Sequence, residues 1–403
     1  MAKVDNARSG GYAQGEKAWM AKNALDDLIQ ALRRRGYRTV LPRVSEGAIV
    51  YADAKNTDNL PIGVLDAQDG GTYRLSQTDE DTYFDYVVGP HSLKNYMFLP
   101  REPVLSGKRV DGKWHFSTPQ DPPEPLAVIG VRSCDLHALA IQDKVFLQGE
   151  YVDAAYQARR AALFLVAVNC RRALATCFCH SMGTGPALDQ GYDLALTELG
   201  GNEEEGGFVV AVGTDSGGDV LSEVPTREAT KAEISKAQEQ VRQLAQELEQ
   251  RDCGPADAAP SASDLPRQRQ LDTGGIRDLL LNNLEHTQWE DVAERCLACA
   301  NCTLVCPTCF CSSVEEISDL TGEEVRRERV WSSCFTAEHS YMNSGVVRQN
   351  TKARYRQWLV HKLATWIDQF DVSGCVGCGR CITWCPVGID LTEEVAAIRG
   401  DQS

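Results

Sequence analysis

Two cysteine motifs in the C-terminal third constrain this chain more than any other feature. One begins at Cys296 and ends at Pro307, and the other begins at Cys375 and ends at Pro386. Both read C-x2-C-x2-C-x3-C-P, the run that holds paired [4Fe–4S] clusters in ferredoxins. A pair of four-thiolate zinc sites is the alternative, but two copies with proline in register favour iron–sulfur clusters.

The spacing within the motifs assigns the ligands. Three thiolates at three-residue spacing wrap one corner of a cube, and the fourth lies a helical turn further on and reaches the other cluster. The expected ligands of one cluster are therefore Cys296, Cys299, Cys302 and Cys385. Those of the second are Cys375, Cys378, Cys381 and Cys306.

Length, charge and cysteine content narrow the class of protein. The 403 residues are enough for two or three domains. A net charge of −16 argues against nucleic acid and favours a protein surface as the partner. Sixteen cysteines clustered at metal-binding spacings favour a reducing compartment.

No targeting or membrane segment is expected. The N-terminal residues have no charged region followed by an apolar run, so no secretory signal is predicted. The longest apolar run, Ala161–Val168, is shorter than the roughly 20 residues that cross a bilayer. We expect a soluble, cytoplasmic protein without direct membrane contact.

The N-terminal segment combines helical and strand patterns. Residues 1–18 are polar and Gly-containing, and we expect a flexible N-terminus there. From Trp19 to Leu32 the apolar positions follow helical spacing, and Gly36 stands where a helix-terminating glycine belongs. Strands are predicted at Tyr37–Leu41 and Ala48–Ala52, followed by a loop-rich α+β segment over 61–125.

The next segment predicts a sheet. Short continuous apolar runs alternate with a helical pattern between Leu136 and Val145. Such runs are typical of strands buried in a mainly parallel sheet, so we expect an α/β domain over 19–225. An exposed turn is expected at 202–206. The runs are Leu126–Val131, Ala162–Val168, Leu194–Leu196 and Phe208–Val212.

Residues 226–274 predict one long helix and a linker. Thr230 and Glu233 form a capping box. Apolar residues then recur at steps of three and four from Ile234 to Leu248, which indicates a heptad-like seam that packs on this protein or on a partner. The segment 252–275 is rich in Pro, Ala, Ser and Gly, as linkers are.

Residues 275–403 hold both cysteine motifs. Helices are predicted at Ile276–Leu284 and Asp291–Cys296, and between the motifs at Glu315–Arg329 and Thr351–Ile367. Helices in that gap favour an α-helical ferredoxin domain over a compact bacterial ferredoxin. The predicted fold is therefore an α/β (α+β) N-terminal domain followed by a C-terminal α-helical ferredoxin domain with two [4Fe–4S] clusters.

A second set of cysteines lies in the predicted α/β domain. Two members follow strands directly, where an open α/β sheet places its ligands, and the other two form a C-x-C pair in a loop. Four thiolates at this sheet edge predict a third [4Fe–4S] site; buried structural cysteine is the alternative. His137 and His180 are expected to be hydrogen-bonding neighbours. The four cysteines are Cys134, Cys170, Cys177 and Cys179.

Three more cysteines, Cys309, Cys311 and Cys334, follow the first ferredoxin motif. They are expected to lie beside a cubane without binding iron, to supply an alternative fourth ligand, or to form part of another cluster. The run 308–313 also echoes the run 176–181, which indicates a shared local fold at a cluster edge. Cys253 lies in the linker and is expected to bind nothing.

Other catalytic motifs are absent from the sequence. It has no dinucleotide-binding glycine fingerprint after a strand, no phosphate-binding P-loop and no nucleophile elbow. No separate Cys-x-x-Cys pair remains for a nickel centre. The chain is therefore expected to carry electrons between catalytic partners.

These cysteine-bearing segments resemble one family, the beta subunits of cytoplasmic NAD(P)-linked [NiFe] hydrogenases, or sulfhydrogenases. An iron–sulfur subunit of anaerobic sulfite reductase is closely similar. The resemblance covers roughly residues 20–225 and 275–395. It rests on Gly130–Ala138, Asn169–Cys170, Cys177–Pro186, Cys306–Cys311 and Trp331–Cys334.

The resemblance implies a complex of four kinds of subunit. A flavin subunit would exchange hydride with NAD(P)H, this chain would pass single electrons onward, and a small iron–sulfur subunit and the [NiFe] subunit would complete the path. A sirohaem subunit would replace the hydrogenase module in the sulfite reductase case. The resemblance also implies that Cys134, Cys170, Cys177 and Cys179 bind the third cluster. Catalysis by a reactive thiol among Cys309, Cys311 and Cys334 is a further alternative.

Overall fold

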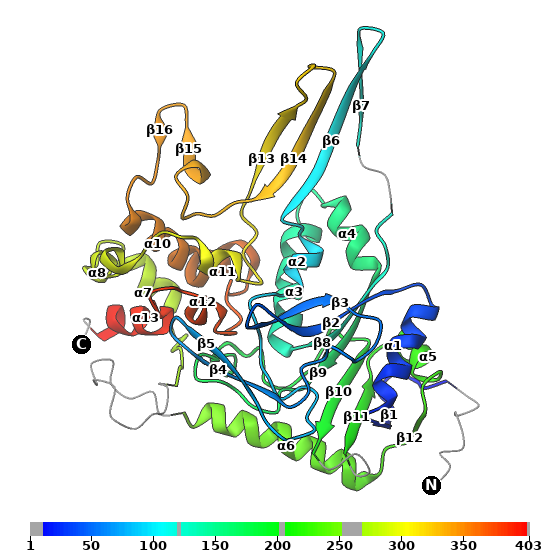
Figure 1. The fold of residues 1–403 in the computed structure, drawn as a ribbon. Coiled ribbons are helices and arrows are strands. Elements are labelled where there is room, and N and C mark those ends of the chain that lie inside the picture. The colour runs from blue at the N-terminus through cyan, green and yellow to red at the C-terminus, as the bar shows by residue number, and fades with distance from the viewer. Residues whose placement is uncertain (1–10, 119–121, 201–205, 252–267, 401–403) are drawn as a thin grey trace.

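A central mixed sheet of eight strands organises the N-terminal half of the chain (Figure 1). The computed structural model describes residues 11–118, 122–200, 206–251 and 268–400. The strand order is β12-β1-β11-β10-β9-β8-β2-β3. The four central strands β10, β9, β8 and β2 are parallel, and both flanks of the sheet are antiparallel.

The strands of this sheet follow the apolar runs of the sequence. In β8 and β9 nearly every side chain is buried, as expected for strands covered on both faces. The strands are β1 (Lys17–Ala21), β2 (Arg38–Ser45), β3 (Ala48–Asp53), β8 (Leu126–Val131), β9 (Leu163–Val168), β10 (Leu194–Leu199), β11 (Gly207–Val212) and β12 (Thr226–Glu228).

The first strand corrects two expectations. Lys17–Ala21 lies between β11 and β12, so Trp19 and Met20 belong to a strand and not to the predicted helix. The expectation of a flexible N-terminus up to residue 18 is wrong for Tyr12, which is buried, and for Lys17 and Ala18, which lie in β1; residues 1–10 lie outside the described residues. This added antiparallel flank also makes the sheet mixed where a mainly parallel one was predicted. The expected turn at 202–206 falls mostly on residues 201–205, outside the described residues.

Helices cover the sheet. Along α1 (Ala24–Arg34) one face is fully buried in the core, and Gly36 follows the helix with φ of +88°. A backbone with positive φ suits glycine, which has no Cβ to clash. The other helices of this half are α2 (Lys94–Met97), α3 (Ser133–Leu147), α4 (Ala154–Ala161), the 3-10 turn η1 (His180–Met182) and α5 (Asp215–Leu221).

The long helix α6 (Lys231–Glu249) packs on this protein. Thr230 and Glu233 form the predicted capping box, and Ala237, Leu244 and Leu248 are buried. The helix lies against β10, β11 and η1. After it, Arg251 donates hydrogen bonds to the carbonyls of the 173–177 loop, which bears Cys177. The helix therefore supports that loop. Most of the predicted linker, residues 252–267, is outside the described residues.

A second sheet projects from the body as an arm (Figure 1). Its order is β13-β14-β6-β7, so a hairpin from between the cysteine motifs pairs with a hairpin from the N-terminal half. The prediction of a helix at Glu315–Arg329 is wrong. Six of the seven side chains of β13 are exposed and only Glu328 and Val330 of β14 are buried, so the sequence carries no apolar alternation. The strands are β6 (Arg101–Val110), β7 (Lys113–Ser117), β13 (Ser312–Ser318) and β14 (Glu324–Trp331).

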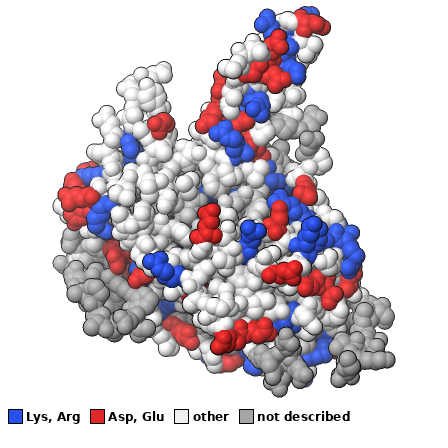
Figure 2. Space-filling view, in the orientation of Figure 1, with Lys and Arg blue, Asp and Glu red and all other residues white. Residues whose placement is uncertain are grey.

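Acidic and basic side chains alternate over the arm, whereas the neighbouring β15–β16 hairpin is almost uncharged (Figure 2). That hairpin exposes Tyr341 and Met342. Two small hairpins complete the strand set: β4 (Val64–Asp69) with β5 (Thr72–Gln77), and β15 (Tyr341–Met342) with β16 (Gly345–Val346).

The cysteine motifs lie in a helical region with its own core of Trp, Tyr, Leu and Ile side chains. The predicted helix at Thr351–Ile367 forms, with a π-helical turn at its centre. The helices are α7 (Ile276–Asn282), α8 (Gln288–Arg295), α9 (Asn301–Leu304), the 3-10 turn η2 (Glu338–Ser340), α10 (Thr351–Val360), the π-helical turn η3 (His361–Thr365), α11 (Trp366–Phe370), α12 (Arg380–Thr383) and α13 (Leu391–Gly400). None of the helices in the described residues is both long enough and apolar enough to span a membrane.

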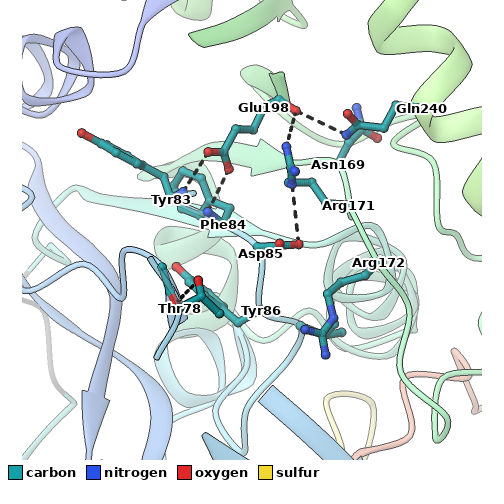
Figure 3. Close-up of polar contacts among 12 residues, drawn as sticks. Thr78, Tyr83, Phe84, Asp85, Tyr86, Asn169, Arg171, Arg172, Glu198 and Gln240 are labelled. Carbon is teal, nitrogen blue, oxygen red and sulfur yellow. Dashed lines mark hydrogen bonds and ion pairs between the residues drawn. The ribbon is translucent and has the colours of Figure 1, made fainter. Parts of the chain in front are cut away.

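A buried carboxylate ties the sheet to the segment beneath it (Figure 3). Glu198 of β10 is fully buried and accepts hydrogen bonds from the amides of Tyr83 and Phe84 at 2.8 and 2.9 Å. Its main-chain oxygen accepts from Arg171, which also pairs with Asp85 at 3.5 Å. This network fixes the loop that follows β9 and carries Cys170.

We predict that Glu198→Ala lowers the free energy of unfolding by about 2–4 kcal/mol, because two buried amides lose their acceptor. Urea unfolding of the anaerobically purified chain measures the loss. Glu198→Gln, which keeps one acceptor oxygen, should cost less. Equal stability of Glu198→Ala and the wild type would contradict the role of this carboxylate.

Candidate iron–sulfur sites

The first predicted ligand set surrounds one cavity. Cys296 follows α8 directly, Cys299 lies in the turn before α9, Cys302 lies in α9, and Cys385 comes from the second motif. All four line the same cavity, together with Phe335, Tyr355 and Trp358. Cys299 is the exposed member. Cys381, predicted for the second set, lines the cavity as well, so three cysteines of the first motif and two of the second meet there.

The second set lies deeper in the protein. Burial raises the pKa of the Cys381 thiol well above its usual range, and the neighbouring thiolates of Cys375, Cys378 and Cys306 raise it further. In the first set, the pKa of Cys302 is raised in the same way by burial and by Cys296, Cys385 and Cys299. Thiols that disfavour one another's charge in this way suit a shared cationic group such as an iron–sulfur cluster.

The two motifs repeat one backbone turn. The amide of Ala298 donates to Cys296 Sγ, and the amide of Gly377 donates to Cys375 Sγ, both at 3.4 Å. The corresponding residues have matching positive φ, at 50° for Ala298 and 62° for Gly377. At this position the first motif has an alanine with a strained positive φ, whereas the second motif has a glycine, which adopts positive φ without strain.

Packing explains that glycine. A Cβ on Gly377 would lie 2.5 Å from the carbonyl oxygen of Phe178, and this contact is with backbone that cannot move aside cheaply. The amide of Phe178 in turn donates to Gly377 at 2.8 Å, and Thr184 Oγ1 donates to the carbonyl of Val376 at 2.6 Å. The second motif is thus pressed against the loop that carries Cys177 and Cys179.

That loop completes the third predicted set. Cys134 stands in the first turn of α3 directly after β8, and Cys170 follows β9 after one residue, so both lie at the strand ends where they were expected. Cys134, Cys170, Cys177 and Cys179 line one cavity. Burial raises the pKa of Cys179 well above its usual range, and Cys177 and Cys170 add to the shift.

The three sets adjoin one another. Cys378 of the second set also lines the cavity of the third. Cys306 of the second set is among the thiols that raise the pKa of Cys302 in the first set. Between the second and third sets, Arg380 forms a fully buried ion pair with Asp135 at 2.9 Å. The thiols therefore run from the exposed Cys299 through the second set to the third.

The remaining cysteines form two contacts beside this row. A hydrogen bond from Cys309 is the largest influence on Cys306 and, against the effect of burial, holds the pKa of that thiol well below its usual range. Cys334 and then His339 hydrogen-bond to Cys311, and together they lower its pKa to about 4 although burial opposes them. These hydrogen bonds favour the thiolate form of Cys311.

The basic side chains beside the cysteines were only partly foreseen from the sequence. His137 pairs with Asp189 at 3.2 Å, in keeping with its expected role as a hydrogen-bonding neighbour, and His180 begins η1. His339, Lys94 and Lys362 were missed, although the structure places all three beside cysteines. Cys253 is outside the described residues.

The described residues show no site for a single metal ion. Among them, no group of three or more His, Cys, Asp or Glu side chains is arranged to hold one.

The comparisons with known proteins agree with these motifs. A family model described as a 4Fe-4S dicluster domain matches residues 295–389, which include both motifs. Sulfhydrogenase 2 subunit beta of Pyrococcus furiosus is 29% identical over 338 residues, covering 81% of this chain and 89% of that protein. The chain is a homologue of that sulfhydrogenase subunit. The aligned length extends well beyond the matched 4Fe-4S domain. The search of solved structures found no significant match.

We predict that Gly377→Ala lowers the free energy of unfolding by about 1–3 kcal/mol, because the added Cβ forces the second motif away from Phe178. Ala298→Gly is the matched control at the equivalent position of the first motif, and it should cost almost nothing because its φ is positive. Urea unfolding of both variants under anaerobic conditions checks the difference. Equal effects of the two substitutions would contradict the proposed packing.

Proposed function

We propose that this chain is the iron–sulfur electron-transfer subunit of a multi-subunit oxidoreductase. In this proposal it relays single electrons between a flavin subunit that binds NAD(P)H and a [NiFe] hydrogenase module that includes a small iron–sulfur subunit. Catalysis then belongs to the partners. The single observation that carries the proposal is the contiguity of the three cysteine sets.

The proposed ligands are the twelve cysteines of the three sets. [4Fe–4S] clusters supply one-electron oxidation and reduction when bound. The chain's own part is to hold the thiols in a row, to bury the second and third sets, and to leave Cys299 exposed at one end. Main-chain amides that donate to Cys296, Cys375 and Cys385 orient these thiols.

The choice of partner separates the hydrogenase assignment from its nearest alternative, an electron-transfer subunit of anaerobic sulfite reductase or another sulfur reductase. The 29% identity to a sulfhydrogenase subunit supports the hydrogenase assignment. We predict that the tagged chain, isolated anaerobically from its native host, copurifies with a nickel-containing subunit and a flavoprotein. Metal analysis and flavin fluorescence of the eluate measure this. A sirohaem protein without a nickel subunit would exclude the hydrogenase assignment.

One observation favours a second candidate function, a catalytic reductase with a reactive thiol. Cys311 is partly exposed, and hydrogen bonds from Cys334 and His339 lower its pKa and so favour the reactive thiolate form. Under our proposal, Cys311→Ser and Cys334→Ser in the purified complex retain iron and leave the ratio of products unchanged, altering at most the rate of electron transfer. The opposite result would be a variant that no longer reduces one substrate but still transfers electrons between hydrogen and an artificial acceptor. That result would assign catalysis to this thiol.

A further inference from the structure

Two buried lysines lie beside the second cysteine set. Lys94 begins α2 in the N-terminal half, and Lys362 lies in the π-helical turn η3. Each is only 4% exposed. Buried lysines need a partner because removing an ammonium ion from water is costly. A π-helical turn inside an α-helix is often found at a functional site.

The contacts of both lysines fit the charged form, and for Lys94 they oppose the burial that lowers its pKa. Lys362 Nζ donates to Cys306 Sγ at 3.2 Å, to the Gly374 carbonyl at 3.0 Å and to Thr308 Oγ1 at 3.4 Å. Lys94 Nζ donates to three main-chain carbonyls at 3.1 to 3.3 Å, those of Thr303, Leu304 and Cys306. Three acceptors use three N–H bonds, which an ammonium has and a neutral amine lacks.

The negative charge opposite these lysines comes from sulfur. Within the described residues, neither ammonium forms an ion pair with a carboxylate, and the thiolate of Cys306 is the largest favourable charge at Lys362. Arg380 also lies near the second set, but Asp135 balances its charge. The two lysines are therefore the cations at this set whose charge no carboxylate among the described residues balances.

The first set has a different environment. Its cavity is lined by aromatic and aliphatic side chains and by no lysine or arginine among the described residues. Arg295 acts on Cys296 from outside the cavity, but it is half-exposed and paired with Glu394 at 2.7 Å. An exposed and paired arginine contributes little field compared with a buried ammonium that donates directly to a ligand sulfur.

We propose that Lys362, with Lys94 behind it, raises the reduction potential of the group held by Cys306, Cys375, Cys378 and Cys381 above that of the group held by the first set. Reduction adds negative charge, and a fixed cation in a low-dielectric site stabilises the reduced form. Hydrogen bonds to ligand sulfurs act in the same direction. The inference rests on the proposed function, and it makes the second site a more favourable place for an electron than the first.

The test is a redox titration of the full chain, purified anaerobically and followed by electron paramagnetic resonance at constant pH. At the wild-type midpoint potential, Lys362→Met should raise the ratio of oxidised to reduced cluster about tenfold for one signal. For a one-electron couple this corresponds to a midpoint potential lower by about 59 mV. Lys362→Arg keeps the charge and should restore most of the ratio. Cys306→Ser should alter the line shape of that same signal, which assigns it to the second site.

Two further variants keep the test decisive. Lys352→Met is the control. Lys352 lies on α10 and its ammonium binds Glu290 at the surface, so the substitution should leave the midpoint potential unchanged. If Lys362→Met loses iron, Lys94→Met carries the test, since Lys94 contacts main-chain carbonyls and no ligand sulfur; a smaller shift in the same direction is expected. Loss of iron in both variants would show that the lysines serve assembly and would overturn the inference.

The outcomes also separate this inference from the proposed function. The wild-type chain could show reducible signals whose midpoint potentials Lys362→Met shifts no more than Lys352→Met does. That result would refute the role of the lysines and leave the proposed function standing. A wild-type chain without any reducible iron–sulfur signal would refute the proposed function itself.

Discussion

The fold depends on an exchange between two distant cysteine segments. Cys306, from the first motif, lies among the thiols of the second, and Cys385 returns to the cavity of the first. Each motif therefore contributes one cysteine to the set of the other motif. The intervening residues 307–374 must form a structure that begins and ends beside these two sets. They do so as the β13–β14 hairpin, which pairs with β6, and as the α10–α11 helical segment, whose side chains form the core beside the motifs.

The second motif also joins the two halves of the chain. Gly377 has no room for a side chain because the carbonyl of Phe178 approaches it, and the Arg380–Asp135 pair is buried immediately beside it. A buried ion pair contributes little net stability, but breaking it by removing one partner is costly. The segments before and after the predicted boundary at residue 275 therefore pack against each other, because the third cysteine set and the second motif share one interface.

The sequence was informative wherever spacing or burial leaves a pattern. The continuous apolar runs predicted β8, β9 and β11, and the cysteine motifs predicted that thiols from both ends of the C-terminal segment lie together. Patterns failed where charged residues stand on both faces of a strand, as in β13 and the first half of β14. Pairing partners also leave no local signal, so β1 and the mixed character of the sheet were missed. Assignment of the ligands and of the domain boundaries remains a prediction.

Lys362 shows how a functional neighbour can escape a motif search. It stands on the apolar face of its helical segment, four residues after Trp358 and four before Trp366, both of which are buried. A lysine at such a position is the available signal, because lysine is almost never buried without a partner. The partner, Cys306, is 56 residues away in sequence, and only the fold brings the two together.

The central claim is that three adjoining sets of four thiols each hold a [4Fe–4S] cluster. Iron and acid-labile sulfide per chain, measured on protein purified without oxygen, test it most directly. The account predicts about twelve of each. About eight would contradict it by removing the site at Cys134, Cys170, Cys177 and Cys179, and about sixteen would contradict it by requiring a cluster at Cys309, Cys311 and Cys334.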